Sequence, residues 1–399
     1  MTALALVLIA LPLAAFGYAY VGYPLLLRIL AARRPAAATP PEPAEWPAIS
    51  IALPAYNEER SIAATIESLL RLDYPADRRR IVVVSDASTD RTDEIVRSFA
   101  ARGVELLRMP ARSGKTAAEN ATVPLLHGEI VVNTDATIRI PPHSLKPLIR
   151  AFQDPTVGVA SGRDVSVGNL DEEANAGEAG YVGYEMKVRA LETRLGSIVG
   201  ASGCFYAIRR HLIDAEYPAA LSRDFASPLR ARQFGFRSVS VDEAVCLVPR
   251  ATSLRAEYRR KVRTMARGLE TLWYSRAMLN PWRYGGFAWM LASHKLCRWL
   301  VPLTLPGAVV GLALLSPASA PAAAALLAFA VVSALGVFGF AWPGQPPRAL
   351  ALCAFAVAAN LAGLHAWIKA LRGERNPIWE PTRRPLEVAA PVAAEARRD

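Results

Sequence analysis

The sequence predicts an α/β domain with a mostly parallel sheet flanked by helices, joined to transmembrane helices at both ends. Short, continuous Val/Ile runs alternate with amphipathic helical patterns between residues 48 and 250, which is typical of strands buried on both faces. Apolar residues make up 52% of the 399-residue chain and gather at its two ends. Polar residues follow four consecutive strands.

Residues 1–30 are expected to form a transmembrane helix. No charge interrupts Ala3 to Leu27, and at about 1.5 Å per residue this run can cross a bilayer core of about 30 Å. A cleaved signal peptide is the alternative, but no Lys or Arg precedes the run. Arg28, Arg33 and Arg34 follow it, so the positive-inside rule predicts a cytoplasmic domain after a proline-rich linker over 31–47.

Residues 299–372 contain three runs long enough to span, at 299–315, 320–342 and 349–368. Charge is almost absent there, which disfavours a soluble helical domain. One span before the cytoplasmic domain and three after it would leave the basic tail over 373–399 outside, against the same rule. Either one run is re-entrant or the count differs by one. We expect a multi-pass protein of the cell inner (plasma) membrane.

The segment 251–298 is expected to form basic interfacial helices in contact with membrane lipids. Between residues 250 and 298 there are eleven Lys and Arg and two acids, interleaved with Trp and Tyr. Nucleic-acid binding is the rival interpretation of such a patch, and the adjacent span makes it the poorer one, so we expect no nucleic-acid partner. The four cysteines are far apart without C-x-x-C, which argues against disulfides or zinc.

Within the domain, over 48–250, we expect strands at 48–55, 80–86, 104–109 and 129–135 and helices at 61–72, 88–103 and 114–126. Ser61 is the expected N-cap of the first helix, and Gly103 ends the second. In parallel sheets, ligands bind beyond the carboxyl ends of strands. There, "YNEE" follows the first strand, Asp86 ends the second, residues 112–115 follow the third, and Asp135 ends the fourth.

No G-x-G-x-x-G follows the first strand and no P-loop motif is present, so phosphates would be handled by a metal, Lys and Arg. The motifs "PAYNEE" (54–59), "VVVSDASTDRT" (82–92), "RSGKTAAEN" (112–120) and "DATIRIPPHSL" (135–145) resemble those of membrane-bound family-2 glycosyltransferases of the GT-A, Rossmann-like fold. This group includes bacterial polysaccharide synthases. The resemblance runs from about residue 48 to 270.

The resemblance implies that Glu58 and Asp86 hold the base and ribose of a nucleotide sugar, Lys115 lies near its pyrophosphate and Asp135 engages Mg²⁺ or Mn²⁺. The full expected nucleotide-sugar set is Ala55, Tyr56, Glu58, Asp86, Lys115, Asp135 and Arg267. Thr137 replaces the second acid of the family's D-x-D. One carboxylate suffices for a cation that keeps waters and phosphate oxygens as ligands. The alternative is a site that has lost its metal and its activity.

The second half of the expected site is less regular. Glu178, Glu185 and Glu192 are spaced one heptad apart, with Arg189 four residues after Glu185. This pattern predicts either a solvated helix face with an ion pair or an acceptor-facing helix. "GASGCFYAIRR" (200–210) resembles a family region and suggests close approach to a sugar. On that basis Gly203 and Arg210 are assigned to the acceptor side.

By resemblance to the family's acidic catalytic segment, Asp224 is the expected general base. Arg223 replaces the usual first acid and would keep Asp224 charged. An N-capping role for Asp224 is the alternative. Residues 259–268 occupy the place of Q-x-x-R-W, of which only Arg267 is retained. With Gly at 268, Trp273 is the acceptor-side aromatic candidate.

The sequence therefore predicts an inverting transfer of a sugar from a nucleoside diphosphate, with UDP expected, to a lipid-linked or polysaccharide acceptor. One alternative is a polyprenyl-phosphate sugar transferase. Another is a non-catalytic membrane partner that binds nucleotide sugar.

Overall fold

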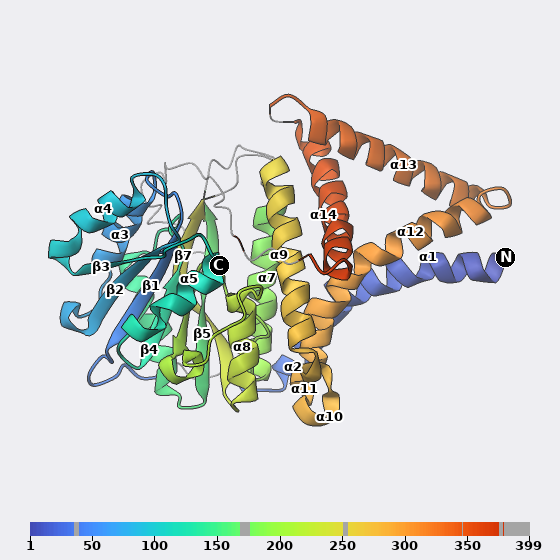
Figure 1. Cartoon of the computed structure of the whole chain (residues 1–399). Helices are drawn as coiled ribbons and strands as arrows, with labels where there is room; N and C mark the ends of the chain where they lie inside the picture. The colour runs from blue at the N-terminus through green and yellow to red at the C-terminus, as the bar shows by residue number, and fades with distance from the viewer. Residues whose placement is uncertain (36–39, 168–175, 250–253, 345, 375–377, 379–399) are drawn as a thin grey trace.

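A seven-stranded sheet forms the centre of the α/β domain (Figure 1). The computed structural model describes the chain except residues 36–39, 168–175, 250–253, 345, 375–377 and 379–399. Part of the expected linker over 31–47 and most of the expected tail over 373–399 therefore lie outside the described residues.

The strand order is β3-β2-β1-β4-β6-β5-β7, and all strands except β6 run in one direction. The mostly parallel sheet flanked by helices is thus confirmed. The strands are β1 (Ile49–Ala55), β2 (Arg79–Ser85), β3 (Val104–Arg108), β4 (Ile130–Thr134), β5 (Val157–Val167), β6 (Phe205–Arg209) and β7 (Arg237–Pro249). The helices packed around them are α3 (Ile62–Leu70), α4 (Thr92–Ser98), α5 (Lys115–Thr122), α6 (Leu145–Arg150), α7 (Ala176–Leu195) and α8 (Arg223–Gln233).

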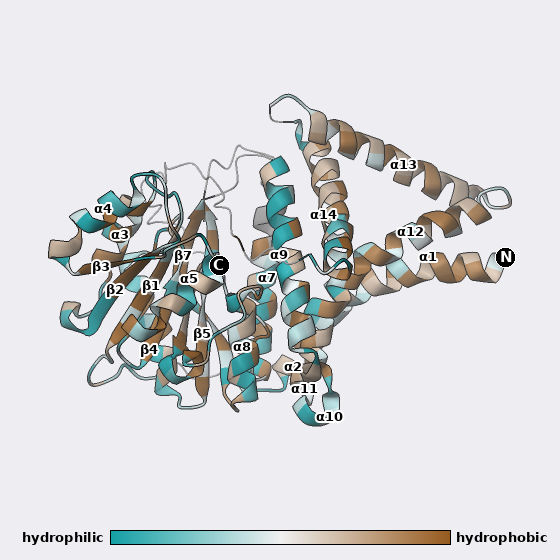
Figure 2. Cartoon of the chain, viewed as in Figure 1, coloured by the Kyte–Doolittle hydropathy of each residue, from teal (hydrophilic) through white to brown (hydrophobic). Residues whose placement is uncertain are grey.

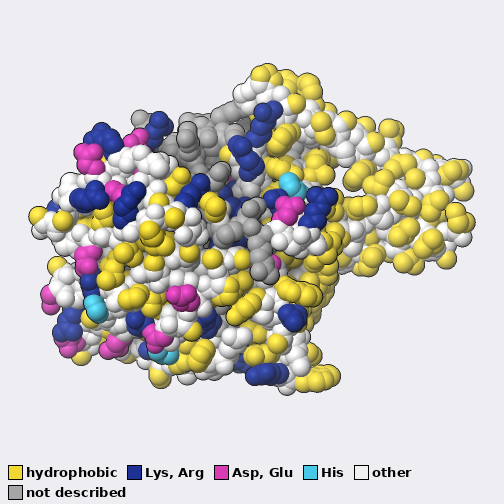
Figure 3. Space-filling model, in the orientation of Figure 1, with side chains coloured by type: hydrophobic (Ala, Val, Ile, Leu, Met, Phe, Trp, Pro, Cys, Tyr) yellow, Lys and Arg dark blue, Asp and Glu magenta, His cyan; other side chains and the backbone are white. Residues whose placement is uncertain are grey.

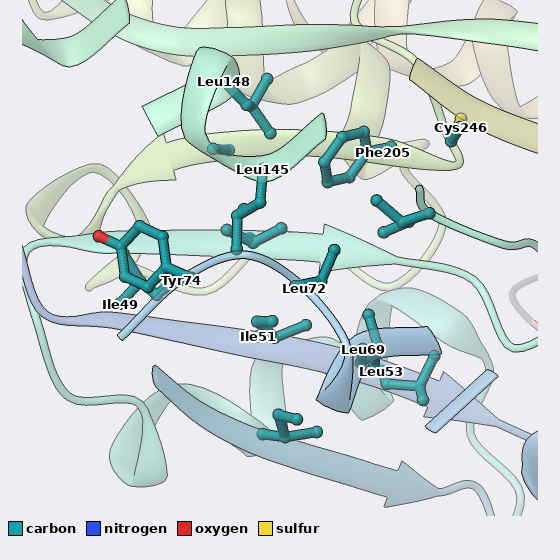
Figure 4. Packing of buried hydrophobic residues seen from close by; sticks show 14 of the residues in the cluster. Ile49, Ile51, Leu53, Leu69, Leu72, Tyr74, Leu145, Leu148, Phe205 and Cys246 are labelled. Carbon is teal, nitrogen blue, oxygen red and sulfur yellow. The ribbon is translucent and has the colours of Figure 1, made fainter. Parts of the chain in front are cut away.

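Each face of the sheet buries its own apolar cluster, because successive residues of a strand point to opposite sides. Ile49, Ile51 and Leu53 of β1 pack with residues of α3 and α6, among them Leu69 and Leu145 (Figure 4). On the other face, residues of β2, β4 and β6 pack against α8 and the segment before it. Burial on both faces explains the unbroken Val/Ile runs in the sequence.

Four helical segments within the described residues are long and apolar enough to cross a membrane: Thr2–Ala32, Gly286–Leu315, Ala320–Ala341 and Arg348–Leu371. They comprise α1 (Thr2–Gly17) with α2 (Tyr23–Ala32), α11 (Gly286–Leu291) with α12 (Arg298–Leu315), α13 (Ala320–Ala341) and α14 (Arg348–Leu371). The second segment begins well before residue 299, where the sequence predicted it to start. Its basic residues Lys295 and Arg298 pair with Glu185 of α7.

The four apolar segments are not arranged alike. Helices α1, α12 and α13 extend away from the sheet, whereas α14 runs alongside the amphipathic helix α9 (Leu254–Tyr274) (Figures 1 and 2). Contacts between the two helices include the Lys261 ammonium 4.6 Å from the centre of the Phe355 ring, Gly363 facing Met265, and the Tyr258 hydroxyl 3.2 Å from His365 Nδ1. The short helix α10 (Pro281–Tyr284) follows α9.

We predict that Gly128→Ala destabilises the domain strongly. Gly128 has φ +92°, and an added Cβ would lie 2.3 Å from the Ala48 carbonyl oxygen beside β1. We expect a loss of more than about 2 kcal/mol in the free energy of unfolding, measured by thermal unfolding in detergent. The control is Gly235→Ala, which shares a positive φ of +85° but has open space around it. Its expected cost is about 1 kcal/mol, and equal losses in the two variants would contradict the prediction.

Candidate active site

Asp86 organises the loop that precedes α5. Its side chain is buried, with Oδ1 accepting the Ser113 N–H at 2.7 Å and Oδ2 accepting the Gly114 N–H at 2.8 Å. The Asp86 N–H in turn donates to the Ala55 carbonyl at the end of β1. The carboxylate expected to meet the nucleotide therefore holds the loop that delivers Lys115.

Lys115, the first residue of α5, links the ends of two strands. Its ammonium donates to Asp135 Oδ1 at 2.5 Å, just after β4, and to the Gly203 carbonyl at 3.1 Å, just before β6. Burial favours the neutral amine, but the charges of Asp135, Glu119 and Asp224 outweigh it and hold the pKa of Lys115 above its ordinary value. The site thus contains a fixed positive charge, well placed to face a diphosphate.

Asp224 lies in the first turn of α8 and faces the same corner. Ser222 Oγ donates to its Oδ1 at 2.6 Å, and Ser222, not Asp224, occupies the N-cap position. A Cβ at Gly203 would lie 3.1 Å from Asp224 Oδ2. Gly203 therefore holds Lys115 through its carbonyl while leaving room beside the Asp224 carboxylate.

Arg223 points away from this corner, contrary to the expected role beside Asp224. Its side chain is buried with Nε 4.0 Å from Glu119 Oε2 and its guanidinium over the Tyr217 ring. Burial raises the pKa of Glu119, while Lys115 and Arg223 oppose the shift. Glu119 was missed in the sequence, although its position four residues after Lys115 on one helix was a usable signal.

Arg267 connects α9 to the site. Its Nη2 donates to Thr116 Oγ1 at 2.7 Å and to the Leu221 carbonyl, next to the start of α8. The Arg112 guanidinium lies 3.9 Å from the centre of the Tyr56 ring. Glu58 is buried, and its Oε2 accepts the Ser61 hydroxyl at 2.7 Å. Ser61 therefore precedes α3 as predicted, but its hydroxyl bonds Glu58 instead of capping the helix.

The structure does not bring Arg210, an acceptor-side candidate, to this corner. Arg210 lies at the opposite edge of the sheet, where it donates to the Val123 and Leu126 carbonyls and pairs with Asp214. Because β6 is antiparallel to β4, the five residues from Phe205 to Arg209 carry the chain away from the site.

Trp273 is 68% exposed, and the Arg276 guanidinium lies 4.9 Å from the centre of its ring. The indole near position 268 comes instead from Trp299 of α12. A Cβ at Gly268 would lie 2.7 Å from the Trp299 ring, which also packs edge-on against Phe225 at 5.8 Å. A tryptophan from a different helix therefore fills the space that a side chain at 268 would take.

The heptad acids on α7 are buried in the structure, so the solvated-face interpretation is wrong for Glu185 and Glu192. His294 bridges them, with Nε2 2.8 Å from Glu185 and Nδ1 2.6 Å from Glu192. The predicted ion pair between Glu185 and Arg189 is present at 3.7 Å. The side chain of Glu178 lies outside the described part of the chain.

The residues present suit a divalent cation only in a limited way. No cluster of three or more His, Cys, Asp or Glu able to hold a metal occurs among the described residues. Asp135 offers one carboxylate, of which Oδ1 already accepts from Lys115. Such a donor set fits a cation whose remaining ligands are waters and phosphate oxygens.

The α/β domain is similar in sequence to known glycosyltransferases. Residues 50–215 match the family model described as glycosyl transferase family 2. A β-monoglucosyldiacylglycerol synthase of Nostoc sp. is 28% identical over 173 residues, which cover 42% of this chain and 37% of that protein. An undecaprenyl-phosphate 4-deoxy-4-formamido-L-arabinose transferase of Aeromonas hydrophila is 25% identical over 199 residues, 49% of this chain and 58% of that one.

The chain thus spans little more than a third of the first relative's length. Among solved structures, a mannosyltransferase of Pyrobaculum calidifontis in complex with GDP-Man and Mn²⁺ superposes with a TM-score of 0.73 at 24% identity, over 93% of this chain and 99% of that one. The GT-A fold expected from the motifs is confirmed by this likeness.

Proposed function

We propose that the chain, which contains a family-2 glycosyltransferase domain, transfers a sugar with inversion from a nucleoside diphosphate, with UDP expected, to a lipid-linked acceptor at the inner membrane surface. The observation that carries the proposal is the convergence of Lys115, Asp135, Gly203 and Asp224 at one corner of the sheet. This corner lies at the carboxyl ends of the parallel strands, where α/β sheets bind ligands.

In the proposed reaction, Asp224 accepts the proton of the acceptor hydroxyl as its oxygen attacks the anomeric carbon. The bond from that carbon to the diphosphate breaks, and the nucleoside diphosphate leaves with the electron pair. Attack from the face opposite the leaving group inverts the anomeric centre. Lys115 and Arg267 supply fixed positive charge for the departing diphosphate. Asp135 would hold a divalent cation, which would neutralise further phosphate charge.

The different directions of the apolar helices support a membrane arrangement with three crossings. The α1–α2, α11–α12 and α13 segments cross the membrane, whereas α14 lies at the inner surface beside the basic helix α9. Three crossings starting from an outer N-terminus bring the basic tail over 373–399 to the cytoplasmic side. This topology removes the conflict with the positive-inside rule.

We predict that Asp224→Asn lowers sugar transfer by about 10²- to 10⁴-fold, because the amide cannot accept the proton. Binding of the nucleotide sugar, followed by thermal shift, is expected to persist. The matched control is Asp214→Asn at the opposite edge of the sheet, which should transfer normally. Undiminished transfer by Asp224→Asn in membranes would refute the assigned base, and an inverted anomeric configuration in the NMR spectrum of the product tests the stereochemistry.

We predict that chelation with EDTA lowers turnover and that added Mn²⁺ or Mg²⁺ restores it, because the diphosphate needs more positive charge than Lys115 and Arg267 provide. In Asp135→Asn, restoration should require a higher metal concentration. Turnover that is unchanged by EDTA would show that the reaction does not depend on a divalent cation.

We predict that a green fluorescent protein fused after Asp399 fluoresces and that alkaline phosphatase at the same place is inactive. The two reporters respond to the cytoplasmic and outer compartments respectively. Fusions in the loop between α12 and α13, at residues 316–319, should give the reverse result. Phosphatase activity at residue 399 would mean that α14 crosses the membrane.

A further inference from the structure

A cavity of about 530 Å³ lies between α9 and the last turns of α14. It is large enough for a ligand of ordinary size. Its walls come from both helices, and Arg112 and Ala220 of the α/β domain close one side. Asp86, Lys115 and Asp135 are absent from its lining, so the cavity adjoins the candidate active site without coinciding with it.

The cavity carries a strong excess of positive charge. Five basic side chains line it, against two acids, and the basic ones are Arg112, Arg259, Arg263, Arg267 and Lys369. The acids are Glu270 and Glu374, and Glu374 pairs with Lys369 at 3.3 Å. Figure 3 shows Lys and Arg side chains gathered where the α/β domain meets the apolar helices. Several guanidinium groups in one cavity suit phosphate, which they bind through paired N–H donors.

Arg267 connects this cavity to the reacting corner. Its Nη2 is held by Thr116 and Leu221, while its buried Nε has no hydrogen-bond partner among the described residues. From Arg267 the cavity follows α9 back to Arg259, eight residues or about 12 Å along the helix. A sugar at Asp224 and phosphate groups farther along α9 could therefore belong to one molecule.

On the side of α14, the surroundings of the cavity are apolar. Helix α14 exposes large apolar side chains, including Leu352, Leu361 and Ile368, and Leu371 at its end is 78% exposed. His365 and Lys369, in the last two turns, line the cavity. Polar lining at the end of an apolar helix is typical of the head-group level of a membrane.

We infer that the part of this cavity lined by Arg259 and Arg263 binds the phosphate groups of the acceptor, so that the acceptor is a sugar joined to its lipid through phosphate and not a neutral glycolipid. The inference rests on the proposed function, since it names the acceptor class of the same site. Phosphate could also come from the donor's diphosphate or from free anions, and the experiment separates these sources.

The experiment uses the full chain purified in nonionic detergent and measures binding of farnesyl diphosphate, a short lipid diphosphate, without donor. Farnesol and inorganic diphosphate are measured in parallel. We expect farnesyl diphosphate to bind and the other two to bind at least about tenfold more weakly. Farnesol has the lipid chain without the phosphates, and inorganic diphosphate has the phosphates without the chain. Arg259→Gln with Arg263→Gln should raise the Kd for farnesyl diphosphate by about tenfold or more. Arg255→Gln, on the same helix but outside the cavity lining, is the matched control and should leave that Kd unchanged.

Nucleotide-sugar binding by thermal shift is measured on the same variants. It should persist in the double variant and should not be displaced by farnesyl diphosphate. Competition between the two ligands, or equal binding of farnesol or inorganic diphosphate, would overturn the inference. Nucleotide-sugar binding and transfer without any farnesyl diphosphate binding would also overturn it and leave the proposed function intact. Lipid diphosphate binding in a chain that binds no nucleotide sugar would instead refute the proposed function.

Discussion

Two buried carboxylates on α7 fix the membrane helices to the α/β domain. Glu192 accepts the Tyr23 hydroxyl of α2 at 2.6 Å, and His294 lies between Glu192 and Glu185. Arg298 at the start of α12 donates to Glu185 at 2.8 Å. Each ring nitrogen of His294 lies within hydrogen-bond distance of one carboxylate, and Arg298 adds a buried ion pair to Glu185. Removing one partner of such a buried pair typically costs about 3–5 kcal/mol, which makes the docking geometry stiff.

The same cluster reaches the reacting corner through the backbone. Burial alone would raise the pKa of Glu185, but His294, Lys295 and Arg298 hold it well below its ordinary range. Arg189, which pairs with Glu185, donates to the Ala201 carbonyl at 3.1 Å. Ala201 precedes Gly203, whose carbonyl holds Lys115. The position of the membrane helices and the position of Lys115 are therefore set by one continuous chain of contacts.

The first half of the site was predictable from sequence because it depends on local order. In a parallel sheet every strand delivers its following loop to the same edge, so Asp86, Lys115 and Asp135 could be grouped from strand pattern alone. The second half depends on one reversed strand and on contacts across the chain. Nothing in the pattern around Phe205 indicates that β6 runs against its neighbours, which is why Arg210 was misplaced.

The other differences from the sequence-based expectations arise from contacts between residues far apart in the sequence. The charge of Arg223 indicates an acidic partner, but it does not distinguish between Asp224 and Glu119. The glycine at 268 looked like the loss of an aromatic residue, and only the packing of α9 on α12 shows Trp299 in that space. Spacing alone also could not distinguish a solvated row of acids from one that faces a distant histidine.

The lone acid at the end of β4 follows from the charge balance of the corner. Asp135 and Asp224 face two cations, Lys115 and Arg267, so the corner has no surplus negative charge to retain a free divalent cation. A nucleoside diphosphate brings that surplus with it, together with phosphate oxygens as ligands. A second acid in place of Thr137 would bind metal before the donor arrived and would compete for Lys115. With a single acid, we expect metal binding and donor binding to be coupled.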